Sequence, residues 1–318
     1  MLRNPADPSA ADPAGPPTGG VPQRTRRGLL AELRAARARL SRLERDYLRV
    51  RSLNQELLAE LEETNRGVVA LYNEEHQLAL TLQRTFLPQA LPRVPGVDLA
   101  VRYLPAASQS AVGGDFYEAV ETPAGLLLAV GDVMGHNLRA AMVMGELRHA
   151  LRAYATEGHS PDQLLERLDT LLSRHRPGWT ATVCVVLVEP GGARLRVANA
   201  GHPPPLLVTG PGQAHYLAEH GPLLGLGLPR PESVGHRLGA GARLVMVTDG
   251  LVEKRGSALP DAMEQLRRLA ADGPDDSEQL CDLLLDTMGG HQQDDIVIFT
   301  ARLVPGSGAA PPGPSRRG

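Results

Sequence analysis

The sequence predicts an α+β protein, with antiparallel sheets flanked by helices and a long N-terminal coiled-coil helix before them. Two observations support this prediction. A heptad pattern with no proline inside it runs from residue 29 to residue 82. After residue 97 the segments are β-rich, then two helices, β-rich again, two more helices and a last strand. Several consecutive strands are joined by tight turns, which disfavours an alternating parallel βαβ fold.

Composition limits the class of protein. The 318 residues are enough for one large domain with extensions, and the formal charge of -3 gives no basic surface for nucleic acid. Cys184 and Cys281 lack the spacing of a zinc site or a disulfide framework. Apolar runs such as 181–188 are too short to span a bilayer, and residues 1–28 lack the apolar segment of a signal peptide. We therefore expect a cytoplasmic protein that binds neither nucleic acid nor membrane.

Four regions are expected along the chain. Residues 1–28 and 305–318 are rich in Pro and Gly and read as disordered tails. Residues 29–85 form the coiled-coil or linker helix, which ends because Pro88, Pro92 and Pro95 cannot continue it. Residues 86–304 form the globular domain.

The heptad seam of residues 29–82 favours a parallel pair of helices. Its a positions are Leu33, Leu40, Tyr47, Asn54, Leu61 and Val68, and its d positions include Leu29, Ala36, Leu43, Val50, Leu57 and Leu71. In a parallel pair, g residues face e residues of the partner, which joins Glu32 to Arg37, Arg39 to Glu44 and Asp46 to Arg51. A buried Asn54 pair would fix the register. We expect a parallel homodimer, and the alternative is one amphipathic helix packed on its own domain or on a partner's helix.

Within the globular domain, the hydrophobic periodicity and the turn residues predict where the remaining strands and helices lie. Strands are expected at 97–105, 116–122, 125–133, 180–188, 193–201, 215–218, 233–239, 242–250 and 295–303. Helices are expected at 137–155, 160–175, 260–272 and 276–288. Ser160 is the expected N-cap of the second helix, with Pro161 at its first position.

Aspartates at four strand ends indicate a metal site. They are Asp115, Asp132, Asp249 and either Asp294 or Asp295, each beside a glycine or another acid. A single aspartate at a strand end is ordinarily a turn residue. Four carboxylates that converge repel one another, and oxygen ligands of this kind suit Mg2+ or Mn2+. Two such ions ~3.5–4 Å apart can share a water and align it for in-line attack on a phosphoryl group.

The order of the short motifs matches a known family. LQRTFLPQALP, RYLPA, VGGDFYEAV, GDVMGHNLRAAMVM, TATVCVVLVE, ANAGHPPPLLV, GPLLGLG, VTDGLVE and DDIVIF closely resemble the SpoIIE-like branch of the bacterial PPM (protein phosphatase 2C-like) phosphatases, over residues 78–303. The resemblance implies an αββα sandwich, a binuclear Mn2+ or Mg2+ centre, and hydrolysis of phosphoserine or phosphothreonine on a protein. In this branch the usual substrates are phosphorylated antagonists of anti-sigma factors, so sigma-factor regulation is the expected output.

The resemblance also implies roles for single residues. Asp132 is expected to bridge both metals, with the Val133 carbonyl as a further ligand. Asp115 is expected to hold a metal directly or through water, so Asp115 and Asp132 are the expected catalytic residues. Asp249 and Asp294 complete the expected ligand set, with Asp294 preferred to Asp295.

One loop departs from the family pattern. The residues after Asp132 usually include GHG, whereas this chain has Gly135, His136 and Asn137. Asparagine tolerates left-handed geometry and can cap the following helix, so activity is expected to survive. His136 and His202 are expected to stabilise turns, and Arg102 is expected to be a strand-surface residue.

Two other functions stay open at this point. A PPM-fold interaction or scaffold protein that has lost turnover is supported only by Asn137. A small-molecule phosphohydrolase could use the same metal centre.

Overall fold

The computed structural model describes residues 26–105, 113–135, 137–253, 256, 258–290 and 294–304. The chain divides into two compact units, Met1–Val69 and Ala70–Gly318. Helix α1 (Arg26–Phe86) contains the boundary between them, and it begins three residues before the expected position. The expected tail at 305–318 and residues 1–25 of the other lie outside the described residues. Across the described helices, no segment combines the length and hydropathy that crossing a bilayer requires.

The part of α1 in the first unit exposes its apolar seam. Leu33, Leu43 and Leu61 are between 63% and 65% exposed, although each occupies an a or d position. A stripe of this length on a solvated helix is a contact surface for another helix. The parallel homodimer therefore stays a prediction, and the exposed a and d residues of α1 are the surface that it would bury.

The second unit contains two five-stranded antiparallel sheets. One sheet has the order β1 (Val97–Leu104), β10 (Ile296–Leu303), β9 (Arg243–Val247), β6 (Leu206–Gly210) and β7 (Gln213–Tyr216). The other has the order β2 (Asp115–Thr122), β3 (Gly125–Val133), β4 (Ala181–Val188), β5 (Arg194–Ala200) and β8 (Val234–Arg237). β6 was not among the expected strands, because it directly follows three prolines that read as a loop.

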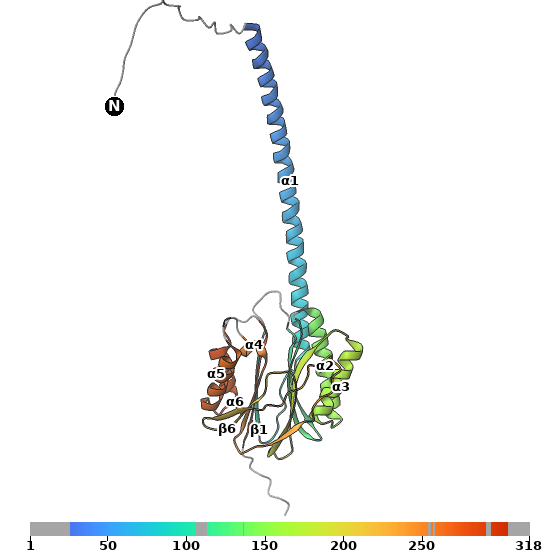
Figure 1. Cartoon of the computed structure of the whole chain (residues 1–318), viewed down its shortest axis with the longest axis vertical. Coiled ribbons are helices and arrows are strands. Elements are labelled where there is room, and N and C mark those ends of the chain that lie inside the picture. The colour runs from blue at the N-terminus through green and yellow to red at the C-terminus, as the bar shows by residue number, and fades with distance from the viewer. Residues whose placement is uncertain are drawn as a thin grey trace, which may run out of the picture. The chain divides into compact units, whose positions relative to one another are not determined.

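Helices cover the outer face of each sheet (Figure 1). Helices α2 (Leu138–Thr156) and α3 (Pro161–His175) pack on the sheet that contains β2, and α5 (Leu259–Asp272) and α6 (Ser277–Met288) pack on the sheet that contains β1. The expected capping of α3 is present, since Ser160 and Gln163 form a capping box. This arrangement confirms the predicted αββα sandwich. A short helix, α4 (Asp249–Val252), follows β9 and was not predicted.

The core has two layers. The larger cluster joins the two sheets to each other and to α2 and α3, and Tyr117 of β2 stacks on Phe299 of β10 with ring centroids 6.1 Å apart. The smaller cluster lies under α5 and α6 and includes Leu266, Leu284 and Ile298. The Tyr117–Phe299 contact shows that the odd-numbered side chains of β2 point into the space between the sheets. Asp115 belongs to that set.

The end of α1 packs on α2 inside the second unit. Gly145 of α2 leaves room for the Phe86 ring, because a Cβ at Gly145 would lie 2.7 Å from that ring. The His149 ring meets the Phe86 ring edge-on, with centroids 6.0 Å apart. Next to this contact, the buried Glu118 carboxylate of β2 accepts a hydrogen bond of 2.6 Å from the Arg148 guanidinium. Helix α2 is thus held by α1 and by β2.

Candidate metal centre

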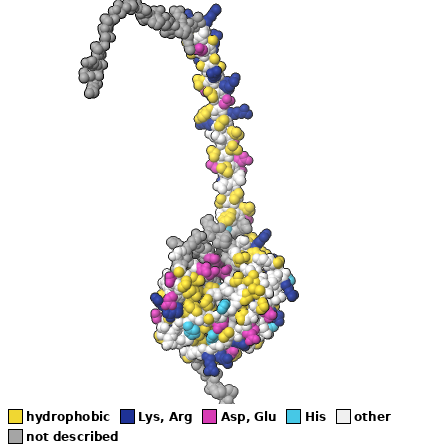
Figure 2. Space-filling view, viewed as in Figure 1, with side chains coloured by type: hydrophobic (Ala, Val, Ile, Leu, Met, Phe, Trp, Pro, Cys, Tyr) yellow, Lys and Arg dark blue, Asp and Glu magenta, His cyan; other side chains and the backbone are white. Residues whose placement is uncertain are grey.

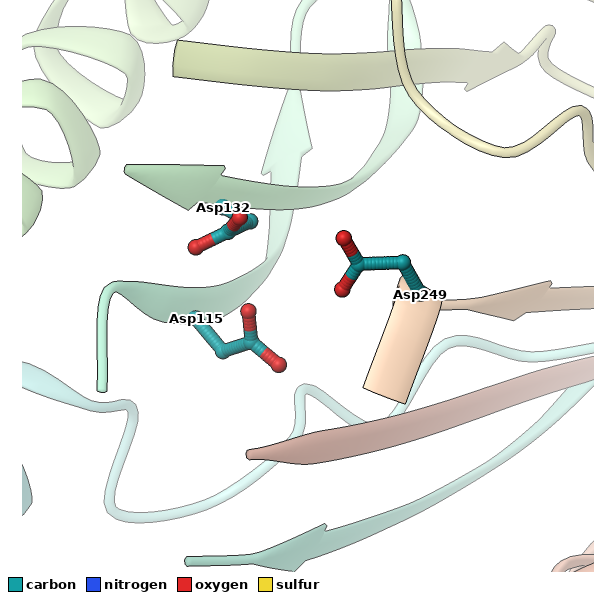
Figure 3. A group of neighbouring side chains, drawn as sticks. All are labelled: Asp115, Asp132 and Asp249. Atoms are coloured by element: carbon teal, nitrogen blue, oxygen red, sulfur yellow. The ribbon is translucent and has the colours of Figure 1, made fainter. Parts of the chain in front are cut away.

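Three of the predicted aspartates meet at one end of the sandwich. Carboxylate oxygens of Asp115, Asp132 and Asp249 all lie within 4.8 Å of one another. The side chains come from β2, from β3 and from the first residue of α4, and they point toward a common centre (Figure 3). Residues separated by 134 positions in the sequence are therefore brought to one site by the packing of the two sheets against each other.

Strand register accounts for the meeting. Asp115 lies directly opposite Asp132 in the antiparallel β2–β3 pair, at the end of both strands. Side chains directly opposite each other in such a pair lie on the same face of the sheet. Asp249 comes from the facing sheet, where it follows β9 and begins α4.

Glycines make room for these carboxylates. A Cβ at Gly114 would lie 2.1 Å from the Val133 carbonyl oxygen and 2.9 Å from Oδ1 of Asp132. A Cβ at Gly113 would lie 1.8 Å from Oδ2 of Asp295. Neither glycine is among those with positive φ, so close approach of neighbouring atoms explains them, and unusual backbone geometry does not.

The electrostatics of the cluster are unfavourable for three charged carboxylates. Burial, followed by the charges of Asp132 and Asp295, raises the pKa of Asp115 well above its ordinary value. Burial, then Asp249 and Asp294, raises the pKa of Asp132 to about 7. The pKa of Asp249 is also raised, first by burial and then by the charge of Asp294.

Two oxygens of the cluster lack partners. Oδ2 of Asp115 and Oδ1 of Asp249 are buried and have no hydrogen-bond partner in the described part of the chain. Repelling carboxylates with unsatisfied oxygens are the donor set that a hard divalent cation requires. The residues present therefore fit the predicted metal site.

The two acids of the DD pair have different surroundings. Asp294 is exposed, and its charge acts on both Asp132 and Asp249. Asp295 is 1% exposed, and its carboxylate accepts a hydrogen bond from the Tyr103 hydroxyl. Figure 2 shows acidic side chains gathered at the end of the domain where α4 lies. The preference for Asp294 as a ligand stays a prediction, since Asp294 is outside the group of three.

The loop after Asp132 has a defined geometry on both sides of His136, which lies outside the described residues. Gly135 has φ +109°, so the residue of this loop with positive φ is Gly135 and not Asn137. Asn137 has an extended backbone with φ -138°, and its Oδ1 accepts a hydrogen bond of 3.1 Å from the Ala140 amide. Of the two possibilities for Asn137, helix capping is the one observed.

Other residues near the centre have structural roles. The backbone N–H of His202 donates to Oδ1 of Asn199 at 2.8 Å, and its Nδ1 lies 2.8 Å from the Thr182 hydroxyl. Burial lowers the pKa of His202 to about 3, so its ring stays neutral. These contacts confirm a turn-stabilising role for His202. Arg102 forms ion pairs with Glu278 and Asp282 on α6, which confirms its assignment to the strand surface.

Two supporting residues were missed in the sequence. Thr248 is fully buried, and a hydrogen bond from it lowers the pKa of Asp115. Its hydroxyl also accepts a hydrogen bond of 2.8 Å from the Val297 amide, which ties β9 to β10. The Tyr103 hydroxyl orients Asp295. Thr248 precedes Asp249 in the TDG motif, so that motif carried the only signal for it.

Comparison with known proteins agrees with this geometry. Residues 122–304 match the family model described as "Stage II sporulation protein E (SpoIIE)". The match includes Asp132, Asp249 and Asp294 and begins after Asp115. The phosphoserine phosphatase RsbU of Bacillus subtilis is 24% identical over 196 residues, which cover 61% of this chain and 58% of that protein. This chain therefore spans less than two thirds of that relative.

Solved structures show the same fold. The RsbU and RsbW domains of a Mycobacterium tuberculosis protein are 35% identical with a TM-score of 0.63, covering 70% of this chain and 64% of that chain. The SiaA-PP2C domain of Pseudomonas aeruginosa is 22% identical with a TM-score of 0.58, covering 75% of this chain and 98% of that chain.

Proposed function

The chain belongs to the SpoIIE family, and on this premise we propose that it is a metal-dependent protein phosphatase that hydrolyses phosphoserine or phosphothreonine on a regulatory protein. One observation carries the proposal: carboxylate oxygens of three aspartates from separate parts of the chain lie within 4.8 Å of one another, and two of these aspartates have a buried oxygen with no hydrogen-bond partner among the described residues. Such a cluster destabilises the folded protein unless cations bind it, which favours a role as a cation site.

The proposed ligands are the aspartates and one backbone oxygen. Two divalent cations, Mn2+ or Mg2+, would be held by Asp115, Asp132, Asp249, Asp294 and the Val133 carbonyl. When bound, the ions supply a water of lowered pKa and positive charge for the phosphoryl oxygens. Asp132 would be the ligand shared by both ions, since its carboxylate lies within 4.8 Å of those of Asp115 and Asp249.

The rest of the chain holds this ligand set in place. The Thr248 hydroxyl interacts with the Asp115 carboxyl group and lowers its pKa. Gly114 lets β2 approach the Val133 carbonyl closely. Asn137 caps α2 and so fixes the end of the loop that follows Asp132. This cap supports retained activity, and the inactive-scaffold alternative is left to the test below.

The proposed substrate is a phosphorylated regulatory protein, specifically an antagonist of an anti-sigma factor. Its support is the resemblance of the motifs, together with the relative RsbU, which is named a phosphoserine phosphatase. Asp294 and Glu253 are exposed beside the partly buried Asp249, so the centre opens to the surface and can receive a phosphate carried by a folded protein.

The test is hydrolysis by the full chain with Mn2+. We expect turnover of p-nitrophenyl phosphate and of a phosphoserine peptide, both lost in Asp132→Ala and on addition of EDTA. Asp286→Ala, an exposed aspartate on α6, is the matched control and keeps full activity. Mn2+ binding without turnover of either substrate supports the scaffold alternative. Turnover confined to small phosphate esters supports the small-molecule phosphohydrolase.

We also propose that α1 dimerises as a parallel pair. In that register the g residue Leu53 faces the e residue Leu58 of the second copy, and these side chains are 54% and 59% exposed in the single chain. A chain with Leu53→Glu should therefore pair preferentially with a chain carrying Leu58→Lys when the two are mixed. Differently tagged chains and co-purification measure this preference, and random pairing would contradict the parallel register.

A further inference from the structure

An apolar surface borders the loop that follows Asp132. We define this apolar rim as Met134, Trp179, Leu226 and Leu228. Met134, Leu226 and Leu228 are 57%, 48% and 50% exposed, and Trp179 is half-buried. Scattered exposed leucines are ordinary, but exposed apolar side chains on segments that border a reaction centre are a candidate contact surface.

Hydrogen bonds make the rim continuous with the metal centre. The Met134 amide donates to the Thr180 carbonyl at 3.0 Å, and the Leu224 amide donates to the Ala181 carbonyl at 2.9 Å. Val133 pairs with Ala181, and Ala181 pairs with Leu224, so three chain segments lie side by side at the end of the sheet. Two strand spacings place Leu224 about 10 Å from Val133.

The loop that presents the two leucines is held rigidly. Oδ1 of Asp169 accepts hydrogen bonds from the Gly225 amide at 2.7 Å and from the Arg230 guanidinium at 3.0 Å. The Arg230 guanidinium also donates to the carbonyls of Pro222 and Leu223. Both charged side chains are at least 91% buried. A buried ion pair thus fixes a loop whose outward side chains are apolar, which lowers the entropic cost of binding against that loop.

The charge pattern indicates the chemistry of the occupant. Residues 133–135, 177–180 and 221–229 contain no ionisable side chain, whereas the adjacent centre is acidic. A charged partner, acidic or basic, would find no opposite charge on the rim itself. Apolar side chains are the partners that this surface can desolvate favourably.

We propose that the apolar rim is the substrate-docking surface of the phosphatase, and that it binds apolar side chains two to three residues from the phosphoserine of the protein substrate. An extended chain advances about 3.3 Å per residue, so two to three residues span most of the ~10 Å between the metal loop and Leu224. This inference rests on the proposed phosphatase function and adds its substrate selectivity.

The experiment compares two phosphoserine peptides with p-nitrophenyl phosphate, using the full chain with Mn2+. One peptide has leucine and valine at the second and third positions on both sides of the phosphoserine, and the other has serine there. We expect kcat/KM to be at least about tenfold higher for the apolar peptide, through a lower KM. The double variant Leu226→Ser, Leu228→Ser should lose this preference and hydrolyse p-nitrophenyl phosphate at the unaltered rate.

The control is Leu259→Ser, which changes a leucine of similar exposure, 45%, at the start of α5. It should keep the preference for the apolar peptide. Equal kcat/KM for the two peptides, or a double variant that retains the preference, overturns the docking role. A double variant that changes the oligomeric state and leaves KM unaltered also overturns it, because the rim would then join copies of the chain. Failure to hydrolyse p-nitrophenyl phosphate at all would instead refute the phosphatase function, and the docking role with it.

Discussion

Replacing Asp132 with asparagine should stabilise the metal-free protein while abolishing metal binding. The carboxylate of Asp132 is largely buried among other carboxylates, and its pKa is raised from an ordinary 3.8 to about 7. The folded state therefore holds a proton that the unfolded state releases between those two pH values. Stability conferred at low pH is lost as the pH rises through that window.

The size of the effect follows from the two pKa values. At about 1.4 kcal/mol for each pKa unit, a rise from 3.8 to about 7 sets an upper limit of about 4 kcal/mol on the destabilisation at pH 8. Asp115 and Asp249 share protons with Asp132, so part of this cost persists when Asp132 alone is replaced. We expect Asp132→Asn to gain about 1–2 kcal/mol at pH 8 and close to nothing at pH 4.

Urea unfolding in EDTA at pH 4, 6 and 8 measures this gain, and Asp286→Asn is the control for replacing an exposed aspartate. In Mn2+ the order should reverse, because the wild-type chain gains binding free energy that the variant lacks. If Asp132→Asn in EDTA is no more stable than the wild-type chain at pH 8, the carboxylates are not in conflict and the electrostatic reasoning fails.

Three further predictions concern the metal centre, the ion pair between β2 and α2, and the contact between α1 and α2. Gly113→Ala should weaken Mn2+ binding at least about tenfold in calorimetric titration, because its Cβ would lie 1.8 Å from Oδ2 of Asp295. Gly67→Ala, whose Cβ meets nothing within 4 Å, is the control, and unaltered affinity in Gly113→Ala would refute this reasoning. Glu118→Gln should cost about 3–5 kcal/mol in urea unfolding by leaving the buried Arg148 guanidinium without its charged partner, whereas exposed Glu121→Gln should be near neutral. A loss below about 1 kcal/mol would mean that Arg148 finds another partner. A chain that starts at Gly96 lacks the packing of Phe86 on Gly145 and His149, so its turnover or Mn2+ affinity should differ from the full chain; equal values would count against coupling through α2.

Sequence reasoning reached the elements that have a strong local signal. The capping box at Ser160 and the period-2 strands are set by neighbouring residues, so their positions follow from short stretches of chain. β6 was missed because its five residues follow Pro203, Pro204 and Pro205, and only pairing with β9 makes them a strand. α4 was missed because a four-residue helix has no period to detect.

The metal centre was predicted by residue type and by motif, but its geometry was not. Glycines before Asp115 indicated close packing without saying what packs there, and the structure identifies the Val133 carbonyl and the Asp295 carboxylate. Asp294 and Asp295 are equivalent as letters in a sequence. They differ only because the chain turns between them, which leaves one exposed and buries the other against Tyr103.

The arrangement of the centre also explains why the fold around it is so firmly held. Three carboxylates at the end of a sandwich repel one another, and that repulsion acts to separate β2 and β3 from the facing sheet. Opposing it are the interaction of Thr248 with Asp115 of the facing sheet and the core packed between the sheets, which includes the stacked rings of Tyr117 and Phe299. The cluster therefore lowers local stability, because its buried carboxylates are not paired with opposite charges among the described residues. A divalent cation turns the net repulsion among the carboxylates into attraction through the ion. Metal binding and close packing of the two sheets should therefore be thermodynamically coupled.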